Sequence, residues 1–420
     1  MNKKVLIIVE NAAVPLDPRV WKEAAALHKA GYKVTVLSPK AVGYTANYEC
    51  IDGVHIYRHP MPKEGRGAFA YIWEYAWALF WEFLYSWWIF VRRGFQVIQA
   101  CNPPDDIFLV ALPFKLFGVK FIFDHHDVNP ELYLAKYGKQ DSLYKILTWL
   151  EKLTFHFSDV VIATNHSYKE IAVGRGSLAP ENVFVVRNGP DLTKFKPVAP
   201  NPALKHGKQF LIGYVGVMGE QDGLDILLDV AEHIRNLGRR DIHFTCVGRG
   251  TAFAELQTIL KEKNLGDMVN FTGRISDEDL LEILSTADVC VNPDKPCQMN
   301  DMSTMIKIME YMALGKAIVQ FDLKEGRISA QEASLYCDKG NQVADFAAKI
   351  LWLVDHPEER ARMGEFGRKR VQTELAWDYS VKNLLAAYDK AFNKTPGDKA
   401  LQANLASSKE QGESGTRMAP

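Results

Sequence analysis

Short apolar runs that alternate with helix-length segments constrain the fold of this chain more than any other feature. Runs without internal polar residues are typical of parallel strands that helices cover on both faces. The alternation occurs twice, and the second series follows a segment rich in Pro, Lys and Asn at 188–208. The expected strands are Val5–Val9, Val34–Leu37, Val54–Tyr57, Val97–Gln99, Phe121–Phe123, Val160–Ala163, Val183–Val186, Phe210–Val215, Phe244–Val247, Val269–Phe271, Val289–Val291, Ala317–Val319 and Leu335–Tyr336.

This pattern predicts an α/β fold of two Rossmann-like domains, whose parallel sheets face each other across a cleft. Ligands bind such sheets at the carboxyl ends of the strands. The expected division is an N-terminal domain, a linker, a C-terminal domain, a closing helix and a tail whose Lys, Ser, Gly and Gln content predicts disorder. The corresponding ranges are 1–190, 191–208, 209–377, 378–392 and 393–420.

Composition excludes several classes of protein. The chain has 420 residues and a formal net charge of −1, so its net charge gives no electrostatic case for binding nucleic acid. Its six cysteines form no Cys-x-x-Cys pair, which favours a reducing cytoplasm over a disulfide-bonded exterior. The first apolar run is too short for a signal peptide. The inner face of the plasma membrane is the alternative cytoplasmic location.

One segment combines an apolar stripe with a set of polar groups. Met305, Ile308, Met309 and Met312 follow helical spacing, and Ser303, Lys307 and Glu310 fall on the opposite side. A helix start with a hydroxyl, a cation and a carboxylate suits a sugar nucleotide. The unpaired N–H groups of the helix start attract a diphosphate, and the carboxylate accepts hydrogen bonds from ribose hydroxyls. The alternative is a solvated helix face.

The turn after the first strand of the second half is rich in glycine. Gly216 and Gly219 lie within it, and small residues there let a phosphate approach backbone N–H groups. The alternative is a plain strand-to-helix turn with Asp222 as N-cap. Neither this turn nor Val247-Gly248-Arg249-Gly250 has the Gly-x-Gly-x-x-Gly spacing, which argues against a nicotinamide-dependent oxidoreductase.

Asp124-His125-His126-Asp127 directly follows an expected strand. Neighbouring side chains on an extended segment point to opposite faces, so the two histidines are poorly placed to share a metal ion. One histidine beside a substrate, oriented by an Asp, is favoured, and a purely structural histidine is the alternative. Asp105-Asp106 lacks the spacing of a metal-binding Asp-x-Asp pair, and no metal or other cofactor is expected.

The segment 71–93 carries five tryptophans together with several Phe and Tyr. Glu74, Ala78, Glu82 and Ser86 recur every four residues and form one narrow polar or small stripe. Such a helix is either a core element or a helix in the membrane interface, where aromatic residues prefer the headgroup level. A spanning helix is disfavoured because Glu74 and Glu82 interrupt the run.

Taken together, several motifs resemble retaining glycosyltransferase family 4, which has the GT-B fold. They are Val185-Val186-Arg187-Asn188-Gly189-Pro190-Asp191, the glycine turn, Phe271-Thr272-Gly273-Arg274-Ile275 and Glu310-Tyr311-Met312-Ala313-Leu314-Gly315-Lys316. The resemblance covers about residues 1–392 and implies a nucleotide-sugar donor in the second domain and an acceptor in the first. It also implies metal-independent transfer with retention, and a last helix that crosses back to the first domain.

The resemblance assigns roles to single residues. Glu310 matches the ribose-binding Glu, His126 the histidine near the donor sugar, Gly216 the diphosphate loop, and Ile275 a backbone contact to the base. The first Glu of the family's pair is Met302 here, and the usual Arg and Lys of the diphosphate loop are Val217 and Asp222. A diphosphate still requires positive charge, so Lys307 is the expected substitute cation, with Ser303, Thr304, Arg249 and Arg274 as further contacts.

The sequence therefore predicts a glycosyltransferase that moves a sugar from a nucleoside diphosphate to an acceptor hydroxyl. Catalytic roles fall on His126, Lys307 and Glu310. The aromatic helix suggests peripheral membrane contact through 71–93 and a lipid-linked acceptor, as in bacterial surface-polysaccharide assembly, with a saccharide acceptor as the alternative. A non-catalytic sugar-nucleotide-binding protein and a sugar-nucleotide epimerase of the same fold are the rival functions.

Overall fold

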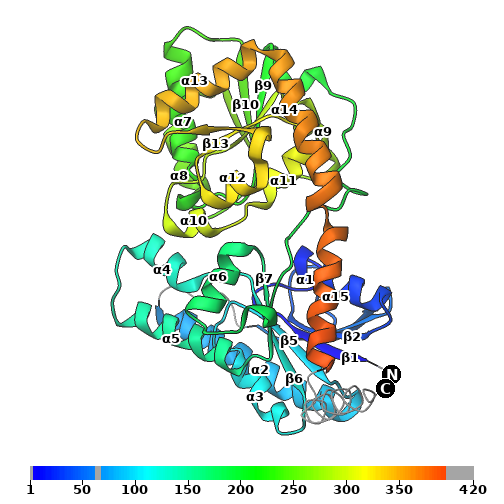
Figure 1. Ribbon diagram of the computed structural model, residues 1–420. Coiled ribbons are helices and arrows are strands. Elements are labelled where there is room, and N and C mark those ends of the chain that lie inside the picture. The colour runs from blue at the N-terminus through cyan, green and yellow to red at the C-terminus, as the bar shows by residue number, and fades with distance from the viewer. Residues whose placement is uncertain (1–2, 62–67, 394–420) are drawn as a thin grey trace, which may run out of the picture.

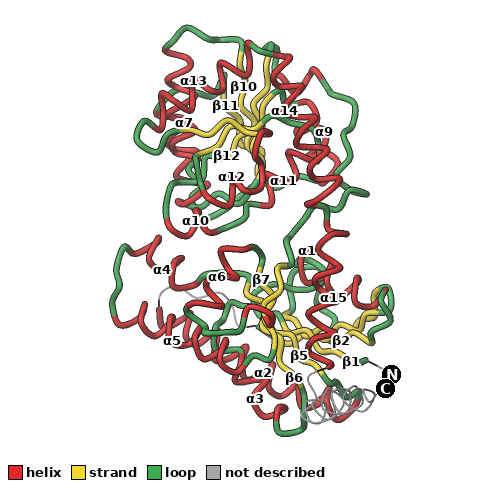
Figure 2. The backbone as a smooth tube through the Cα atoms, in the orientation of Figure 1, coloured by secondary structure: helices red, strands yellow, loops and turns green. Residues whose placement is uncertain are grey.

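The computed structural model describes residues 3–61 and 68–393. Two α/β domains lie one above the other, each with a central sheet between helices (Figure 1). The tube view shows strands gathered at the middle of each domain and helices outside them (Figure 2). The predicted fold class is confirmed.

The N-terminal sheet has strand order β3-β4-β2-β1-β5-β6-β7-β8 within the described residues. Every pairing is parallel except that of β3 with β4. Sequence reasoning missed β3, a short edge strand whose side chains are mostly exposed. The strands are β1 (Lys4–Ile8), β2 (Lys33–Pro39), β3 (Tyr48–Ile51), β4 (Val54–His59), β5 (Val97–Cys101), β6 (Lys120–His125), β7 (Val160–Ala163) and β8 (Val183–Val185).

Helices cover both faces of this sheet. Helix α1 starts as predicted, because the Asp17 side chain accepts the backbone N–H groups of Arg19 and Val20, and Pro18 holds its first turn. The helices are α1 (Pro18–Lys29), α2 (Ala68–Arg92), α3 (Phe108–Lys115), α4 (Asn129–Tyr137), α5 (Ser142–Phe157) and α6 (His166–Gly174), with a 3₁₀ turn η1 (Pro180–Asn182).

The C-terminal sheet is parallel, with strand order β11-β10-β9-β12-β13-β14 in the described chain. Its strands are β9 (Phe210–Val215), β10 (Ile242–Val247), β11 (Val269–Gly273), β12 (Val289–Asn292), β13 (Ile318–Phe321) and β14 (Ser334–Cys337). Its helices are α7 (Leu224–Asn236), α8 (Phe253–Glu262), α9 (Asp277–Thr286), α10 (Gln298–Met302), α11 (Ile306–Ala313), α12 (Lys324–Ala330), α13 (Gln342–Asp355) and α14 (Pro357–Arg370), with short 3₁₀ turns η2 (Pro202–Lys205), η3 (Glu220–Asp222) and η4 (Gln331–Ala333) and a π-helical segment η5 (Val371–Leu375) after α14.

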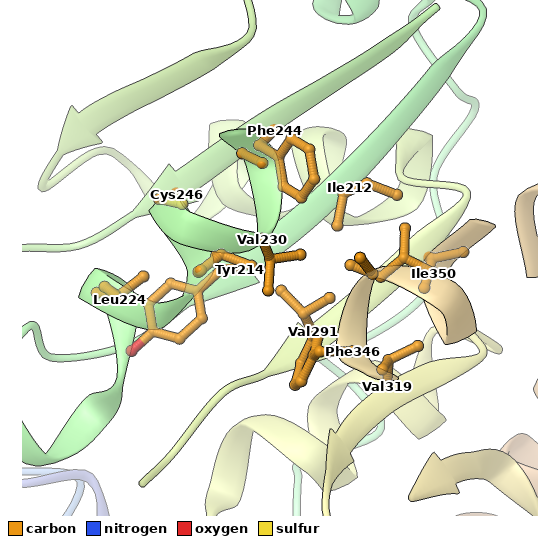
Figure 3. Close-up of a cluster of buried hydrophobic side chains, with 14 of the residues drawn as sticks. Ile212, Tyr214, Leu224, Val230, Phe244, Cys246, Val291, Val319, Phe346 and Ile350 are labelled. Carbon is orange, nitrogen blue, oxygen red and sulfur yellow. The ribbon is translucent and has the colours of Figure 1, made fainter. Parts of the chain in front are cut away.

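Alternating strand residues fill a core on each face of each sheet. In β1, Leu6 and Ile8 belong to one buried cluster, while Val5 and Ile7 belong to the other. In the C-terminal domain, residues from β9, β10, β12 and β13 meet α7 and α13, and Figure 3 shows Tyr214 and Leu224 at one end of this cluster. The sheets are therefore rigid platforms for the loops that follow their strands.

Helix α15 (Trp377–Asn393) returns from the C-terminal domain to the N-terminal one, where it lies beside α1, β6, β7 and β8 (Figure 1). Leu384, Ala387, Tyr388 and Ala391 are buried in the cluster beneath that face of the sheet. The Tyr388 hydroxyl donates to Gln99 Oε1 at 2.6 Å. The last helix thus completes the core of the first domain.

Helix α2 carries apolar side chains on both its inner and its outer side. Ala78, Glu82 and Ser86 are fully buried, whereas Trp73, Phe80 and Phe83 are exposed by 56%, 53% and 38%. The narrow stripe therefore faces the protein, together with Ile89 and with part of the aromatic residues, whereas a second set of aromatic side chains faces outward. The Glu74 side chain lies outside the described residues. Within the described chain, no helix combines the length and apolar character that crossing a bilayer requires.

The helix predicted to begin at Ser303 begins later. Ser303 instead closes α10, and α11 starts at Ile306 after extended backbone at Ser303 and Met305. The hydroxyls of Ser303 and Thr304 have partners in the N-terminal domain, which explains why this stretch is extended. The predicted apolar side is correct, because Ile308, Met309 and Met312 are buried.

Candidate active site

The carboxyl ends of the two sheets meet at the interface between the domains. Helices α10 and α12 face α4 and α6 there (Figure 1). The Asn165 side chain donates to Met302 O at 2.8 Å, and the Ser167 hydroxyl donates to Glu325 Oε1 at 2.7 Å. The loops that follow the strands of both domains are therefore held within reach of one another, as parallel-sheet proteins require for a shared site.

The loop after β9 depends on glycine because backbones pack against each other there. A Cβ atom on Gly248 would lie 1.9 Å from Gly216 O, and one on Gly223, at φ +66°, would lie 2.0 Å from Pro293 O. The Gly216 amide donates to Val247 O at 3.1 Å. The Gly219 amide donates to Asp222 Oδ2 at 2.9 Å. Both predicted phosphate-binding glycines shape this loop, and their own amides are already bonded within the chain.

Lys307 lies directly beneath this loop. A Cβ on Gly216 would approach its Nζ to 3.3 Å. That nitrogen is 3.0 Å from Asp294 Oδ1 and 3.7 Å from Asp222 Oδ1, and it donates to the Tyr214 hydroxyl at 3.3 Å. Lys307 therefore lies beside the Gly216 loop, but its charge is not free. Two carboxylates compensate one ammonium before any ligand binds, which the sequence did not predict.

Burial and charge act on the members of this group in opposite directions. Burial disfavours the ammonium, yet the charges of Asp294 and Asp222 outweigh it, so the pKa of Lys307 lies above its usual value. Burial raises the pKa of Asp222, although Lys307 opposes this. The group therefore contains a buried ion pair between Lys307 and Asp294 and a second carboxyl with a tendency to hold a proton.

Glu310 lies one turn after Lys307 on α11, and its charge interacts with that of Lys22 in the other domain. Burial raises the pKa of Glu310 to about 7, and the nearby charges of Lys22 and Lys307 act against this rise. Lys22, on α1, donates to Gly189 O at 3.0 Å. Burial lowers the pKa of Lys22, while the Glu310 charge opposes that shift. A carboxyl with a pKa of about 7 thus lies at the interdomain surface, where the ribose was expected.

Ser303 and Thr304 contact the N-terminal domain. The Tyr168 hydroxyl lies 3.1 Å from Ser303 Oγ, and Asn165 Nδ2 donates to Thr304 Oγ1 at 3.1 Å. Arg187 Nη1 lies 3.4 Å from the same Thr304 oxygen and Arg187 Nη2 is 3.6 Å from Glu325 Oε2. These two hydroxyls bridge the domains, and any role with leaving phosphates would compete with those bonds.

Arg249, Arg274 and Ile275 sit at the ends of neighbouring strands. The Gly248 amide donates to Gly273 O at 3.0 Å. Arg249 and Arg274 directly follow these two hydrogen-bonded glycines. Both arginines are exposed, and Ile275 is half-buried. The Arg249 guanidinium lies 5.4 Å from the Phe253 ring centroid. These are the predicted donor-contacting cations that no carboxylate within the described residues pairs.

His126 contributes from the N-terminal domain. Its Nε2 lies 2.7 Å from Asp124 Oδ2 and 2.8 Å from Arg19 Nε. Arg19 Nη2 also lies 2.8 Å from Asp124 Oδ1. Burial would raise the pKa of Asp124, but the charges of Arg19 and His126 hold it below its usual value. His125 points away, packed against Phe155, as the alternation predicted.

A buried polar network supports this carboxylate. Gln99 Nε2 donates to Asp124 Oδ2 at 2.9 Å and to Glu23 Oε2 at 2.6 Å. The sulfur of Cys101 and the ligand atoms of Asp124 and His126 lie within 4.8 Å of one another, which is close enough for a metal ion. The Arg19 guanidinium already supplies a cation to both Asp124 and His126, so these groups have a positive partner in the chain itself.

Sequence reasoning missed the residues that form ion pairs or hydrogen bonds with partners distant in the sequence. Arg19, Lys22, Arg187, Asp294 and Glu325 are placed by tertiary contacts, and no short motif marks them. Arg187 lies in a stretch that carried the family resemblance, and Asp294 follows a predicted strand by a few residues. Position after a strand was the one local signal that could have identified Asp294.

Comparison with known families covers most of both domains. Residues 209–356 match the family model described as "Glycosyl transferases group 1", and residues 19–194 match the one described as "Glycosyltransferase Family 4". A relative in sequence is alpha-maltose-1-phosphate synthase of Mycolicibacterium smegmatis, which is 24% identical over 66% of this chain and 74% of that protein. D-rhamnosyltransferase WbpZ of Pseudomonas aeruginosa is 28% identical over 40% of this chain and 41% of that protein.

Solved structures share the architecture. Sucrose-phosphate synthase of Thermosynechococcus elongatus superimposes with a TM-score of 0.77 at 19% identity, covering 94% of this chain and all of that one. HepE of Anabaena, solved in complex with UDP and glucose, has a TM-score of 0.69 at 13% identity over 92% of this chain and 100% of that one. With both domains matched and the loops converging at one interface, the chain belongs to the glycosyltransferases of the GT-B fold.

Proposed function

We propose that this glycosyltransferase moves a hexosyl group from a nucleoside diphosphate donor to an acceptor hydroxyl, with retention and without a metal ion, in polysaccharide biosynthesis. The names of the relatives support this proposal. They include a rhamnosyltransferase and a putative colanic acid glycosyl transferase, and the structural neighbour HepE was solved with UDP and glucose. The acceptor is a lipid-linked saccharide, and the cytoplasmic face of the membrane is the proposed location.

One observation carries the proposal. The Gly216 loop, Lys307 and Glu310 lie at the carboxyl ends of the second sheet, and His126 lies at the same end of the first. A diphosphate against the loop would place its ribose toward Glu310 and its sugar toward the His126 side. We expect the described residues at this interface to act by binding and electrostatics, and not through a covalent intermediate on the protein.

The charges divide the work among these residues. Lys307 is compensated by Asp294 and Asp222, so it fixes the Gly216 loop and adds little net charge. Arg249 and Arg274 supply the positive charge that a leaving diphosphate needs, because they are exposed at adjacent strand ends. Ionised Glu310 accepts hydrogen bonds from the ribose hydroxyls. His126, which Asp124 holds in place, contacts the donor sugar.

A donor-hydrolysis assay tests the enzymatic role. Wild-type protein with UDP-, GDP-, ADP- or TDP-sugars is expected to release nucleoside diphosphate slowly without acceptor, and one donor should raise the melting temperature. Replacing Arg249 and Arg274 by Ala should weaken donor binding by about a hundredfold or more, since each charge-assisted contact contributes about 1.5–3 kcal/mol. Arg240→Ala, another exposed arginine, is the control and should bind normally.

The compensated lysine also favours a second function. A binding protein without catalysis would tolerate a diphosphate site whose only buried cation is already paired, as Lys307 is in the described chain. Under this alternative, one nucleotide sugar raises the melting temperature but neither hydrolysis nor transfer occurs with any donor. Turnover above the Lys307→Met background would exclude it.

The exposed side of α2 supports the membrane part of the proposal. Trp73, Phe80 and Phe83 project outward, and Leu116 and Phe117, which follow α3, are exposed by 88% and 60%. The Phe117 ring lies 5.8 Å from that of Trp87, so α2 and the turn after α3 form one apolar surface. Aromatic residues on such a surface suit the headgroup region of a bilayer.

Vesicle flotation tests this contact. Wild-type protein should float with lipid, and Trp73→Gln/Phe80→Gln/Phe83→Gln should remain in the dense fraction while keeping its melting temperature. Leu237→Gln/Trp352→Gln, which alters exposed apolar residues of the other domain, should float normally. If the triple variant floats like the wild type, the membrane contact does not run through α2.

A further inference from the structure

A basic cavity lies at the end of the N-terminal domain that is farthest from the domain interface. It has a volume of about 250 Å³, and Lys4, Lys33, His55, Arg92 and Arg93 line it. Lys4 and Lys33 are the first residues of β1 and β2, whereas His126 follows the last residue of a parallel strand of the same sheet. The cavity is therefore separated from the candidate active site by the full length of the sheet.

The cations around this cavity lack acidic partners. In the described part of the chain, no acidic side chain lines the cavity or forms an ion pair with Lys4, Lys33, Arg92 or Arg93. Burial, followed by the charges of Arg93 and His28, lowers the pKa of His55. Four like charges around one small cavity repel one another, and a bound phosphate would relieve that repulsion.

An aromatic cavity lies next to the basic one. It has a volume of about 460 Å³ and is walled by Tyr48, Tyr57, Trp81, Leu84 and Trp88. Leu84 and Trp88 are exposed by 42% and 44%, and they belong to the outward side of α2. The cavity therefore opens on the surface that the membrane contact uses.

The two cavities share a wall. Arg93 Nε donates to the Tyr57 hydroxyl at 2.7 Å, and the Tyr48 hydroxyl lies 2.9 Å from His55 Nδ1. Arg92 lies 5.5 Å from the Trp88 ring centroid. Arg92, Arg93 and His55 thus each contact an aromatic residue of the neighbouring cavity, so that a charged site and an apolar groove lie side by side.

We propose that these two cavities form one binding site for an anionic phospholipid, with its phosphate among Lys4, Lys33, Arg92 and Arg93 and an acyl chain along Tyr57, Leu84 and Trp88. The proposal rests on the membrane contact proposed above, and goes beyond it by assigning a stoichiometric lipid site. This lipid is not the sugar acceptor, because the site lies at the amino ends of the strands. It orients the enzyme on a negatively charged bilayer.

Vesicle sedimentation tests the charged half of the site. Wild-type protein should bind phosphatidylcholine vesicles that contain phosphatidylglycerol more tightly than phosphatidylcholine alone. Lys33→Ala/Arg92→Ala should reduce the affinity for the anionic vesicles at least about tenfold, as expected for two charge-assisted contacts. Lys145→Ala/Lys152→Ala removes the same charge from exposed positions of α5 and should change it about twofold at most.

A monomeric probe tests the apolar half and separates a lipid from a free anion. Dihexanoyl phosphatidylglycerol below its micelle concentration should bind in a one-to-one ratio, and inorganic phosphate should bind far more weakly. Leu84→Gln should weaken binding of the short lipid several-fold, whereas Val91→Gln, which is 80% exposed outside the groove, should not. Phosphate that competes as well as the lipid, with Leu84→Gln unaffected, would reduce the site to one for a free anion and overturn the proposal.

The outcomes also separate this site from the proposed function. If the wild type ignores all vesicles and the short lipid, both the membrane contact and this site are refuted. If the wild type binds anionic vesicles but Lys33→Ala/Arg92→Ala and Lys145→Ala/Lys152→Ala lose equal affinity, only this site is refuted. Donor hydrolysis without lipid should be unchanged in all four variants, because none touches the domain interface.

Discussion

At the scale of single residues, Lys307 lies beside the expected loop but has two acidic partners that the sequence did not predict. The sequence indicated a cation beside the glycine loop, and the structure places it there. The two aspartates that hold it come from the loop itself and from the stretch after β12. A buried ion pair contributes little net stability, but removal of one partner leaves a charge without compensation.

Lys307→Met is therefore expected to lower the free energy of unfolding by about 3 kcal/mol or more, because Asp294 loses its partner. Lys307→Met/Asp294→Asn should recover most of that loss and still fail to transfer sugar. Urea unfolding with a donor-turnover assay measures both effects. A double variant as unstable as the single one would show that Lys307 stabilises by packing and not by pairing.

Glu310 gives a pH-dependent prediction. Its pKa in the folded chain is about 7, above the usual value of 4.5, so the folded state holds the proton more tightly. Stability from this group is complete below pH 4.5 and is lost as the pH rises to 7. Glu310→Gln should thus stabilise the unliganded protein by roughly 1–3 kcal/mol at pH 8 and hardly at pH 4.5.

The same variant should weaken stabilisation by the nucleotide sugar at pH 8, where the wild-type carboxylate is ionised. Glu278→Gln, an exposed carboxyl on α9, is the control and should change neither quantity. Thermal melting at the two pH values, with and without donor, gives all the values required. Equal stabilisation at both pH values would show that burial of Glu310 does not raise its pKa.

At the scale of elements, periodicity identified the helices and strands but not which side of α2 faces the protein. Buried parallel strands were predictable because they are continuous apolar runs, whereas β3 is short and partly exposed. The recurrence of Ala78, Glu82 and Ser86 correctly marks a stripe. Local sequence does not predict that this stripe faces the protein, because its orientation depends on tertiary contacts. One of them joins Glu82 Oε1 and His59 Nε2, which lie 3.9 Å apart.

Substitutions on the inner and the outer side of α2 should therefore differ in their effect on stability, even where the outer residue is the larger apolar one. Phe80→Gln should change the free energy of unfolding by about 0.5 kcal/mol or less, since the ring is 53% exposed. Ala78→Leu should cost about 1–3 kcal/mol, because it overfills a fully buried position. Urea unfolding compares the two, and a larger loss from Phe80→Gln would contradict the observed orientation of the helix.

At the scale of the whole molecule, the active site could be predicted only in part because it is shared between domains. His126, Lys307 and Glu310 follow from motifs within one domain each. Arg19, Lys22 and Arg187 face partners more than a hundred residues away, as Arg187 and Thr304 do at a separation of 117 residues. Such pairs depend on how the sheets oppose each other, which single-sequence patterns do not encode.

The dependence of the first domain on α15 is testable. Leu384→Ala should destabilise by about 2–5 kcal/mol and increase hydrogen exchange in β7 and β8, because Leu384 is fully buried beneath that sheet. Exchange in β9, β12 and β13 should stay unchanged. Leu353→Ala, a buried leucine of α13, should show the opposite distribution. Equal effects of both variants on both sheets would indicate that the domains unfold as one unit.

The return of α15 has a consequence for how a ribosome makes this protein. Gln99 and its partner Tyr388 are 289 residues apart, so translation at about 5–20 residues per second separates their synthesis by roughly 15–60 s. During that interval the nascent first domain lacks one wall of its hydrophobic interior. We therefore expect the growing polypeptide to need a chaperone until α15 has been synthesised.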